Sequence, residues 1–84
     1  MKRRKLLDKL LAGSKDISFG EFVALLEGFG FVLDRVRGSH HVFARSDVTE
    51  MLSIQPRKDG KAKPYQLRQF LKIVEEYNLE LEED

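Results

Sequence analysis

The sequence predicts one α+β domain: a three-stranded antiparallel sheet with two helices packed on one face, preceded by a short N-terminal helix. Three observations support this prediction. The chain has 84 residues, enough for one hydrophobic core. Apolar residues recur at helical spacing near residues 19–28 and 64–77. Between these segments lie three short runs rich in β-branched and aromatic residues, separated by turn-forming residues. The order α-β-β-β-α buries both apolar stripes on one sheet face and leaves the other face open.

The first segment, residues 1–14, is predicted to be a helical extension outside the main domain of residues 17–79. Its sequence over residues 2–12 is KRRKLLDKLLA, and a Gly-Ser pair at 13–14 is a plausible stop. Four leucines fall at helical spacing: Leu6, Leu7, Leu10 and Leu11. The sequence leaves three alternatives open for this helix, which are docking on the core, binding a partner, or fraying.

A second helix is predicted over residues 19–28. Ser18 and Glu21 occupy the positions of a capping box, in which each side chain accepts a hydrogen bond from the other residue's backbone N–H. The apolar face of this helix consists of Phe22, Leu25, Leu26 and Phe29. Gly30 suits the left-handed conformation that commonly ends a helix.

The next part of the chain predicts three strands. Residues 31–36 form the first strand, residues 37–39 a turn, and residues 40–45 the second strand. The Gly-Ser pair in the turn supplies the backbone freedom that a tight hairpin needs. After a connection at 46–49, the third strand covers residues 51–55.

A basic loop, PRKDGKAKP at residues 56–64, precedes the last predicted helix, which opens near Tyr65 with Pro64 close to its first turn. The apolar stripe of this helix consists of Leu67, Phe70, Leu71, Val74 and Tyr77. Backbone N–H groups at a helix N-terminus favour phosphate, and lysines beside them add positive charge. The loop is therefore a predicted phosphate-binding element; the alternative is a merely solvated loop.

Charge is distributed unevenly along the chain. Residues 1–72 hold all 15 Lys and Arg and 8 acidic residues, a net charge of +7, whereas residues 73–84 hold 6 acidic residues and no basic one. The body is basic enough to attract a polyanion, and residues 80–84 are predicted to be an acidic tail. The alternative is a set of solvated faces with a solubilising tail.

The composition also limits the classes of function and location. The chain has no cysteine, which excludes disulfides and thiolate metal sites and is compatible with a reducing cytosol. Its apolar runs are too short to span a bilayer, and charges interrupt the one that follows the basic N-terminus. We therefore expect a cytoplasmic protein with no membrane partner, no signal peptide and no cofactor.

The two histidines of the chain are neighbours in the second predicted strand. Successive side chains of a strand point to opposite faces, so His40 shares a face with Val42, and His41 shares one with Phe43. Phe43 is the largest apolar group of this strand and belongs on the helix-covered face. His41 then points inward, and His40 projects onto the open face. A bulge within residues 39–41 would invalidate this inference.

An exposed histidine beside cations suggests RNA cleavage. An imidazole can take a proton from a 2′-hydroxyl or donate one to a leaving oxygen, which makes His40 the candidate acid–base group. Cations would stabilise charge on the phosphorus; the sequence offers Arg35, Arg37, Arg45, Arg57, Lys58, Lys61 and Lys63. The alternative is an ordinary surface histidine in a hairpin. No second acid–base group is evident, and no metal site can be assembled from two histidines that face opposite ways.

The stretches GFGFVLDRVRGSHHVF and QLRQFLKIVEEYNL resemble the HicA family, the messenger-RNA-cleaving toxins of bacterial and archaeal toxin–antitoxin pairs. The resemblance covers about residues 17–79. Its most specific element is Gly38-Ser39-His40 followed by Phe43. It implies a fold like that of double-stranded-RNA-binding domains and metal-independent endoribonuclease activity. It also implies an antitoxin of the HicB type that covers the active site, with His40 as the catalytic histidine and Gly38 as a required residue.

The predicted site therefore has His40 and Gly38 in catalytic positions. The predicted RNA-binding residues are Arg35, Arg37, Ser39, Arg57, Lys58, Lys61 and Lys63. One feature departs from the family pattern: many members carry Pro-x-His after the third strand, whereas Pro56 is followed here by Arg57 and Lys58. This departure keeps a second interpretation open, in which the protein is a non-catalytic RNA-binding module or an inactive toxin homologue that retains the antitoxin-binding surface. A third interpretation is a protein–protein adaptor that uses the leading helix.

Overall fold

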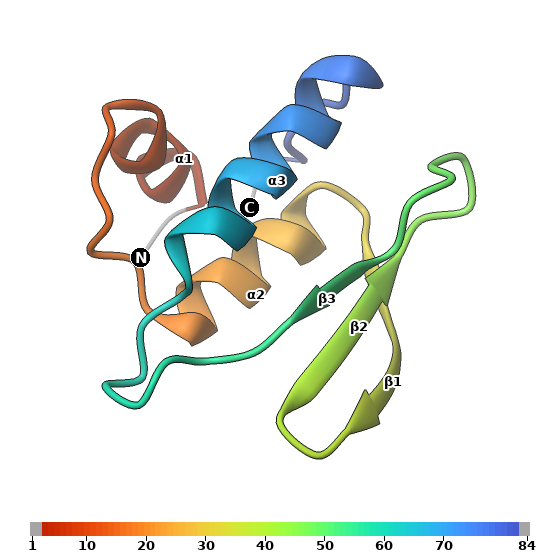
Figure 1. Ribbon diagram of the computed structural model, residues 1–84. Helices are drawn as coiled ribbons and strands as arrows, with labels where there is room; N and C mark the ends of the chain where they lie inside the picture. The colour runs from red at the N-terminus through yellow and green to blue at the C-terminus, as the bar shows by residue number, and fades with distance from the viewer. Residues whose placement is uncertain (1–2, 83–84) are drawn as a thin grey trace.

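The computed structural model describes residues 3–82 and contains three helices and three strands (Figure 1). The helices are α1 (Arg3–Leu11), α2 (Phe19–Gly28) and α3 (Pro64–Glu76). The strands are β1 (Val32–Arg37), β2 (His40–Ala44) and β3 (Leu52–Ile54). Helices α2 and α3 lie between the sheet and α1, so the molecule has three layers and one face of the sheet is uncovered. The predicted α+β fold with an N-terminal helix is confirmed.

The sheet is antiparallel with strand order β1-β2-β3. In β1 the register shifts between Leu33 and Arg35, so Asp34 is the extra residue of a β-bulge. Beyond this bulge, Arg35 pairs with Val42 and Arg37 pairs with His40. Paired residues lie on the same side of a sheet, so both arginines project onto the open face.

The hydrophobic core lies between the sheet and the helices. The Phe70 ring of α3 makes edge-to-face contacts with the rings of Phe22, Phe29 and Phe31, at centroid separations of 5.7, 5.4 and 6.5 Å. Phe43 of β2 is buried on the same side, as the alternation of the strand predicts. Burial of one such aromatic side chain contributes roughly 1.5–3 kcal/mol, so this cluster supplies much of the driving force for folding.

Local signals account for both ends of α2. At its start, the Ser18 hydroxyl accepts from the Glu21 backbone N–H at 3.1 Å, and the Glu21 carboxylate accepts from the Ser18 N–H at 2.9 Å. At its end, Gly30 has a φ of 85°. The backbone N–H groups of Gly30 and Phe31 donate to the carbonyls of Glu27 and Leu26, which is a Schellman motif. The sequence predicts Phe31 as the first residue of the first strand; in the structure this residue belongs to the motif that ends α2, its side chain is buried in the core, and β1 begins at Val32.

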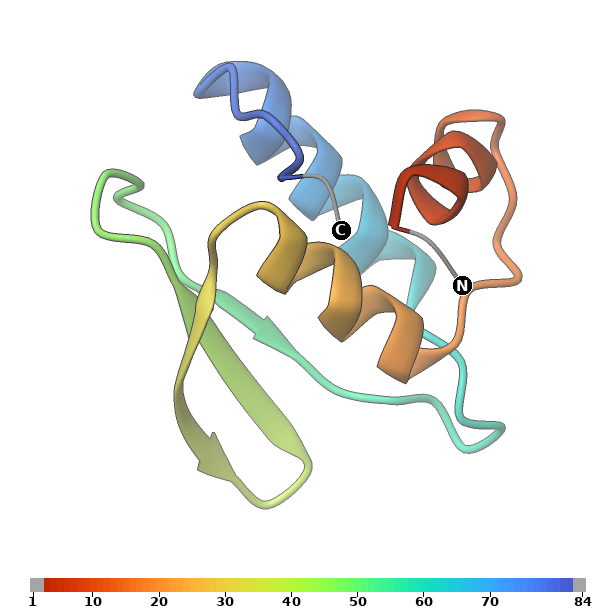
Figure 2. The same cartoon turned by 180° about the vertical axis from the view of Figure 1, so that it is seen from behind.

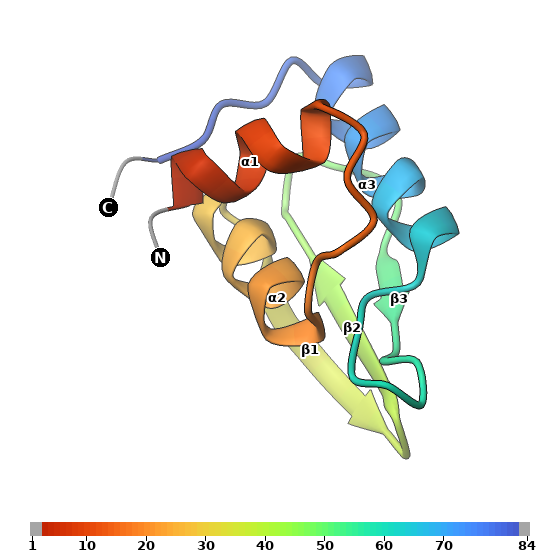
Figure 3. The same cartoon turned by 90° about the vertical axis from the view of Figure 1, so that its left-hand side faces the viewer.

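The N-terminal helix docks on the domain, which decides among the three alternatives left open for it. Leu6, Leu7 and Leu10 are buried in the common core, whereas Leu11 is exposed. The segment after α3 turns back toward α1 and the end of α2 (Figures 2 and 3). There the Glu82 N–H donates to the Gly28 carbonyl at 2.8 Å. The acidic end, as far as Glu82, thus packs on the helices and not on the open face of the sheet.

A buried polar residue, Gln66, closes the outer edge of β3. Its amide nitrogen donates to the Ser53 carbonyl, and its amide oxygen accepts from the Gln55 backbone N–H, both at 3.2 Å. For these two backbone groups, the side chain therefore takes the place of a neighbouring strand. The predicted stripe of α3 omitted Gln66, and it also omitted Ile73, which is buried. None of the helices within residues 3–82 is long and apolar enough to cross a bilayer.

Candidate active site

The open face of the sheet carries a shallow hollow of about 400 Å³, which we call the open-face hollow. Six residues line it: Arg35, Arg37, His40, Val42, Met51 and Ser53. Five of them come from β1, β2 and β3, where the strand register brings them together, and Met51 immediately precedes β3. Three of them, Arg35, Arg37 and His40, are residues that the sequence pattern singled out.

The turn between β1 and β2 sets the position of His40. It contains two residues, Gly38 and Ser39, because Arg37 pairs directly with His40. Gly38 has a φ of 58°, and Ser39 is not among the residues with positive φ. This is the pattern of a type II′ turn, in which glycine is favoured at the first central position. The turn places His40 at the first position of β2, where the hairpin projects away from α1 (Figure 3).

The two imidazoles have different surroundings. His40 is exposed, and its side chain makes no hydrogen bond or ring contact with any residue between 3 and 82. His41 is half-buried on the helix side, where its ring meets the Phe19 ring edge-on at 5.1 Å. The His41 Nδ1 atom lies 3.1 Å from the Ser39 carbonyl oxygen, to which it can donate a proton in the Nδ1–H tautomer. The predicted facing of both rings is confirmed, and no bulge interrupts residues 39–41.

The arginines near the hollow differ in how far they are already neutralised. Arg35 donates to the Asp34 carboxylate at 2.5 Å, so part of its charge is compensated. Arg37 makes no ion pair within the described part of the chain. The Arg45 guanidinium donates to the Phe29 carbonyl at 2.6 Å and to the Asp47 carboxylate at 2.7 Å. This residue lines a different hollow. Arg37 is therefore the guanidinium with the most freedom to hold a phosphate beside His40.

The basic loop between β3 and α3 packs on the start of α2, apart from the open-face hollow. The Phe19 N–H donates to the Gly60 carbonyl at 2.9 Å, and the Ala62 N–H donates to the Ile17 carbonyl at 2.8 Å. None of the predicted loop cations lines the open-face hollow; these are Arg57, Lys58, Lys61 and Lys63. The loop and the hairpin nevertheless meet at one residue, because Phe19 contacts His41 through its ring and Gly60 through its backbone.

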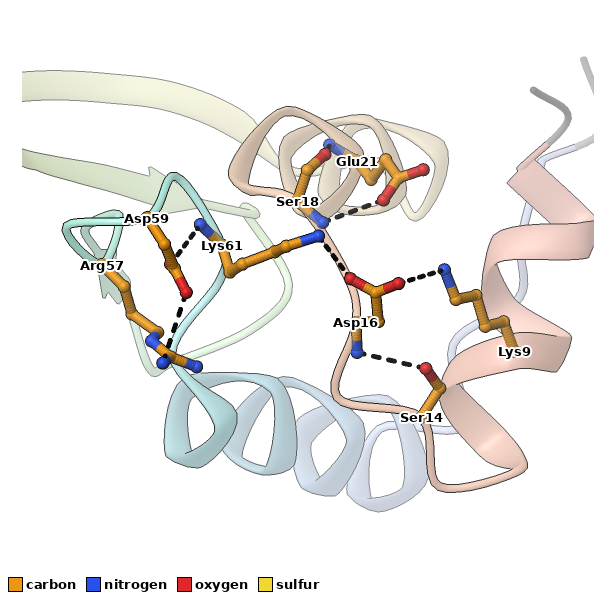
Figure 4. A network of polar contacts seen from close by, with 8 residues as sticks. All are labelled: Lys9, Ser14, Asp16, Ser18, Glu21, Arg57, Asp59 and Lys61. Atoms are coloured by element: carbon orange, nitrogen blue, oxygen red, sulfur yellow. Dashed lines mark hydrogen bonds and ion pairs between the residues drawn. The ribbon is translucent and has the colours of Figure 1, made fainter.

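Two of the four loop cations, Arg57 and Lys61, form ion pairs with acidic residues (Figure 4). The Lys61 ammonium donates to the Asp16 carboxylate, which the Lys9 ammonium also approaches at 3.9 Å. The hydrogen bond from Lys61 lowers the pKa of Asp16, and the same bond raises the pKa of Lys61. Arg57 pairs with Asp59 at 3.4 Å. Lys58 is exposed, and Lys63 is the N-cap residue of α3 without a side-chain capping bond.

Three residues of the hollow, Val42, Met51 and Ser53, were not predicted as site residues. The alternation of β2 already puts Val42 on the face of His40, so this residue was within reach of sequence reasoning. Ser53 and Met51 depend on the pairing of β3 with β2, where Ser53 lies opposite Val42. That register follows from the tertiary fold and has no local signal in the sequence.

Two further observations concern other candidate sites on the surface. A larger hollow of about 580 Å³ lies between α1, α3 and the C-terminal segment, where its walls include Leu7, Leu11 and Leu71, and it contains none of the predicted site residues. Within residues 3–82, no group of three or more His, Asp or Glu side chains is placed to hold a metal ion. The open-face hollow is thus the place where an acid–base group and an unpaired cation occur together.

Comparison with known proteins identifies the family of the chain. No curated protein and no solved structure matches the chain. The family model described as HicA toxin of bacterial toxin–antitoxin matches residues 19–75, which is more than half of the chain and runs from the first residue of α2 almost to the end of α3. The chain therefore belongs to the HicA family of toxins from bacterial toxin–antitoxin systems.

Proposed function

We propose that this toxin is an endoribonuclease that cleaves messenger RNA in the cytoplasm, with His40 as its acid–base group. The observation that carries the proposal is the pair formed by the His40 ring and the Arg37 side chain in one solvent-open hollow, where neither side chain has a partner among residues 3–82. Family membership supplies the context, since it makes the chain the toxin of a pair with a cognate antitoxin. We propose that this antitoxin is HicB-like and that it acts by covering the open-face hollow.

The proposed reaction is a transfer within the RNA chain. His40 removes the proton of a 2′-hydroxyl, and the resulting oxygen attacks the adjacent phosphorus. The bond from phosphorus to the 5′-oxygen breaks, which leaves a 2′,3′-cyclic phosphate on one product. Arg37, assisted by Arg35, stabilises the negative charge that develops on the phosphoryl oxygens. Gly38 and Ser39 place His40 at the rim of the hollow, and no step requires a metal ion.

The leaving 5′-oxygen needs a proton in this mechanism. Apart from His40, the open-face hollow is lined by arginine, valine, methionine and serine side chains, which are not the residue types that usually donate a proton in general acid catalysis. The loop lysines lie outside the hollow, and Lys61 is paired with Asp16. Solvent water therefore donates this proton in the proposed mechanism, and the reaction is slower than one with two matched acid–base groups.

The proposal is tested with purified full-length protein, free of antitoxin, and end-labelled RNA in the presence of a chelator. We expect cut products that end in 2′,3′-cyclic phosphate. The variant His40→Ala should lose about 10²- to 10⁴-fold in cleavage rate, the usual contribution of a general acid or base. His41→Phe is the matched control, because it removes the other imidazole and keeps a ring against Phe19. Undiminished cleavage by folded His40→Ala protein would exclude the assigned role.

A second candidate function is RNA binding without cleavage. Two observations favour it: the open-face hollow lacks a second titratable group, and Pro56 is followed by Arg57 and Lys58 with no histidine. In this case the protein binds the same RNA in the same assay and yields no cut products. Growth of cells that express the wild-type chain without antitoxin would also continue, whereas an active toxin arrests it.

A further inference from the structure

We propose that Val42, Met51 and Ser53 form a seat for one unpaired RNA base, next to the phosphate that His40 and Arg37 engage. This inference rests on the proposed function and names its substrate class, which is single-stranded RNA. It assigns a role to the three residues of the open-face hollow that the cleavage mechanism does not use.

The register of the sheet places these residues beside the reacting groups. Val42 lies opposite Arg35 in β1 and opposite Ser53 in β3, so Arg35, Val42 and Ser53 form a row across the sheet. His40 is two residues before Val42 on the same face, about 7 Å along the strand. A nucleotide whose phosphate lies at His40 can therefore set its base on the row at Val42.

The three residues have the chemistry that a base needs. Val42 is 7% exposed and forms an apolar floor, while Met51 is 45% exposed and stands uncovered at its side. A thioether makes favourable contacts with aromatic rings, including those of bases. The exposed Ser53 hydroxyl can donate or accept, so it can bond to the edge of a base that lies on the floor. Arg37, which forms no ion pair with the residues that the structure describes, supplies the complementary charge for the adjoining phosphate.

This geometry favours an unpaired base over a duplex. In a duplex the faces of the bases are stacked on one another, and a protein reads shape, phosphates and 2′-hydroxyls. A base that lies on Val42 and Met51 has to be out of the stack, which costs least in a single strand. Single-stranded RNA is therefore the ligand that can use both the apolar floor and the cation.

Binding of 2′-O-methyl oligonucleotides tests the proposal, because they cannot be cleaved by attack of the 2′-oxygen. Short single strands of A, C or U and a duplex are titrated at one fixed salt concentration, with fluorescence anisotropy as the readout. Met51→Ala should weaken single-strand binding by roughly 2- to 10-fold, and Met51→Phe should restore it, because an aromatic ring stacks on a base. Ser53→Ala should change the ratio of affinities among the three single strands.

The control variant is Leu11→Ala, which truncates an apolar side chain that is 62% exposed on α1, outside the open-face hollow. It should bind all oligonucleotides as the wild-type protein does. Thermal unfolding of Met51→Ala should match the wild type, which separates loss of the seat from loss of the fold. Unchanged single-strand affinity of Met51→Ala, or an equal loss for the duplex, overturns the proposal.

The outcomes for the base seat and for the proposed function are distinguishable. If His40→Ala abolishes cleavage and Met51→Ala changes nothing, the mechanism stands and the base seat is wrong. If Met51→Ala weakens binding of an uncleavable strand while the wild-type protein cuts no RNA, the seat stands and the second candidate function is correct. If no single strand binds the wild-type protein, the base seat is wrong, and antitoxin binding is then the remaining proposed role of the open-face hollow.

Discussion

The two faces of β2 show how one strand serves two purposes. On the helix side, Phe43 is buried in the core and His41 contacts the start of α2. On the open side, Val42 forms the floor of the open-face hollow, and the His40 ring makes no hydrogen bond or ring contact with a residue in the range 3–82. Because side chains alternate along a strand, a shift of one residue would exchange the two sets. The burial of Phe43 therefore keeps His40 on the outside, so the packing of the core determines the accessibility of the candidate catalytic group.

The strongest test of this comparison is Phe43→Ala. Removing a buried aromatic side chain costs about 3–5 kcal/mol of unfolding free energy, which is a large part of the stability of a small domain. His40→Ala, on the opposite face, should change the unfolding free energy by less than about 0.5 kcal/mol. Urea denaturation of both variants measures the difference. Similar costs for the two substitutions would contradict the division between a structural and a chemical face.

The turn that joins β1 to β2 provides a second test. Gly38 has positive φ, so Gly38→Ala strains the backbone by about 1–2 kcal/mol even though an added Cβ meets no atom within 4 Å. Relaxation of the turn would also move His40, so we expect slower cleavage. Gly20→Ala is the matched control, because this exposed glycine of α2 has room for a Cβ and an ordinary helical φ, and alanine there stabilises the helix by roughly 0.5–1 kcal/mol. Equal stability of the two variants would show that the turn tolerates a side chain.

A smaller effect is expected at His41, the inward partner of His40. His41→Phe keeps the ring contact with Phe19 and loses the hydrogen bond to the Ser39 carbonyl, a cost of about 0.5–1.5 kcal/mol. Cleavage should fall by less than tenfold, because this residue holds the turn and does not face the open-face hollow. Denaturation and cleavage rates of the same preparation measure both quantities. A loss of cleavage as large as that of His40→Ala would show that the two imidazoles act together.

The smallest expected effect concerns the pair of Asp16 and Lys61, which ties the basic loop to the segment before α2. The pKa of Asp16 is lowered in the folded protein by the hydrogen bond from Lys61, so its stabilising contribution is present above the unfolded pKa of about 3.9 and is lost as the pH falls further. Asp16→Asn should lower stability slightly at neutral pH, where the contribution of the pair is present, and change it least at the acid end, so the stability profile in acid becomes flatter. Thermal unfolding between about pH 2.5 and pH 7 measures this. An unaltered acid profile would show that the pair contributes nothing.

Much of the fold and part of the site could be predicted because their signals are local. The capping box at Ser18 and Glu21 and the left-handed Gly30 mark the ends of α2, and the structure confirms both. The facing of His40 also followed from its sequence, because a strand has a period of two and the neighbouring Phe43 is strongly apolar. The roles of His40 and of the cations remain predictions that the experiments above test.

Other features have no local signal, because they depend on segments that are distant in sequence. From the sequence alone, Gln66 has the polarity of a surface residue. Its hydrogen bonds to the backbone of Ser53 and Gln55 depend on the position of β3 beside α3. The basic loop has suitable charges for the site, but its pairing with residues 17–19 holds it away from the open-face hollow.

The sequence by itself thus determined the helices, the hairpin and the direction of its two imidazoles, since these follow from short-range periodicity and from backbone preferences at single positions. Only the tertiary structure decided which cations accompany His40, and it brought Met51 and Ser53 to its side. It did so because strand register and helix docking are set by the burial of the whole core, to which every element contributes at once.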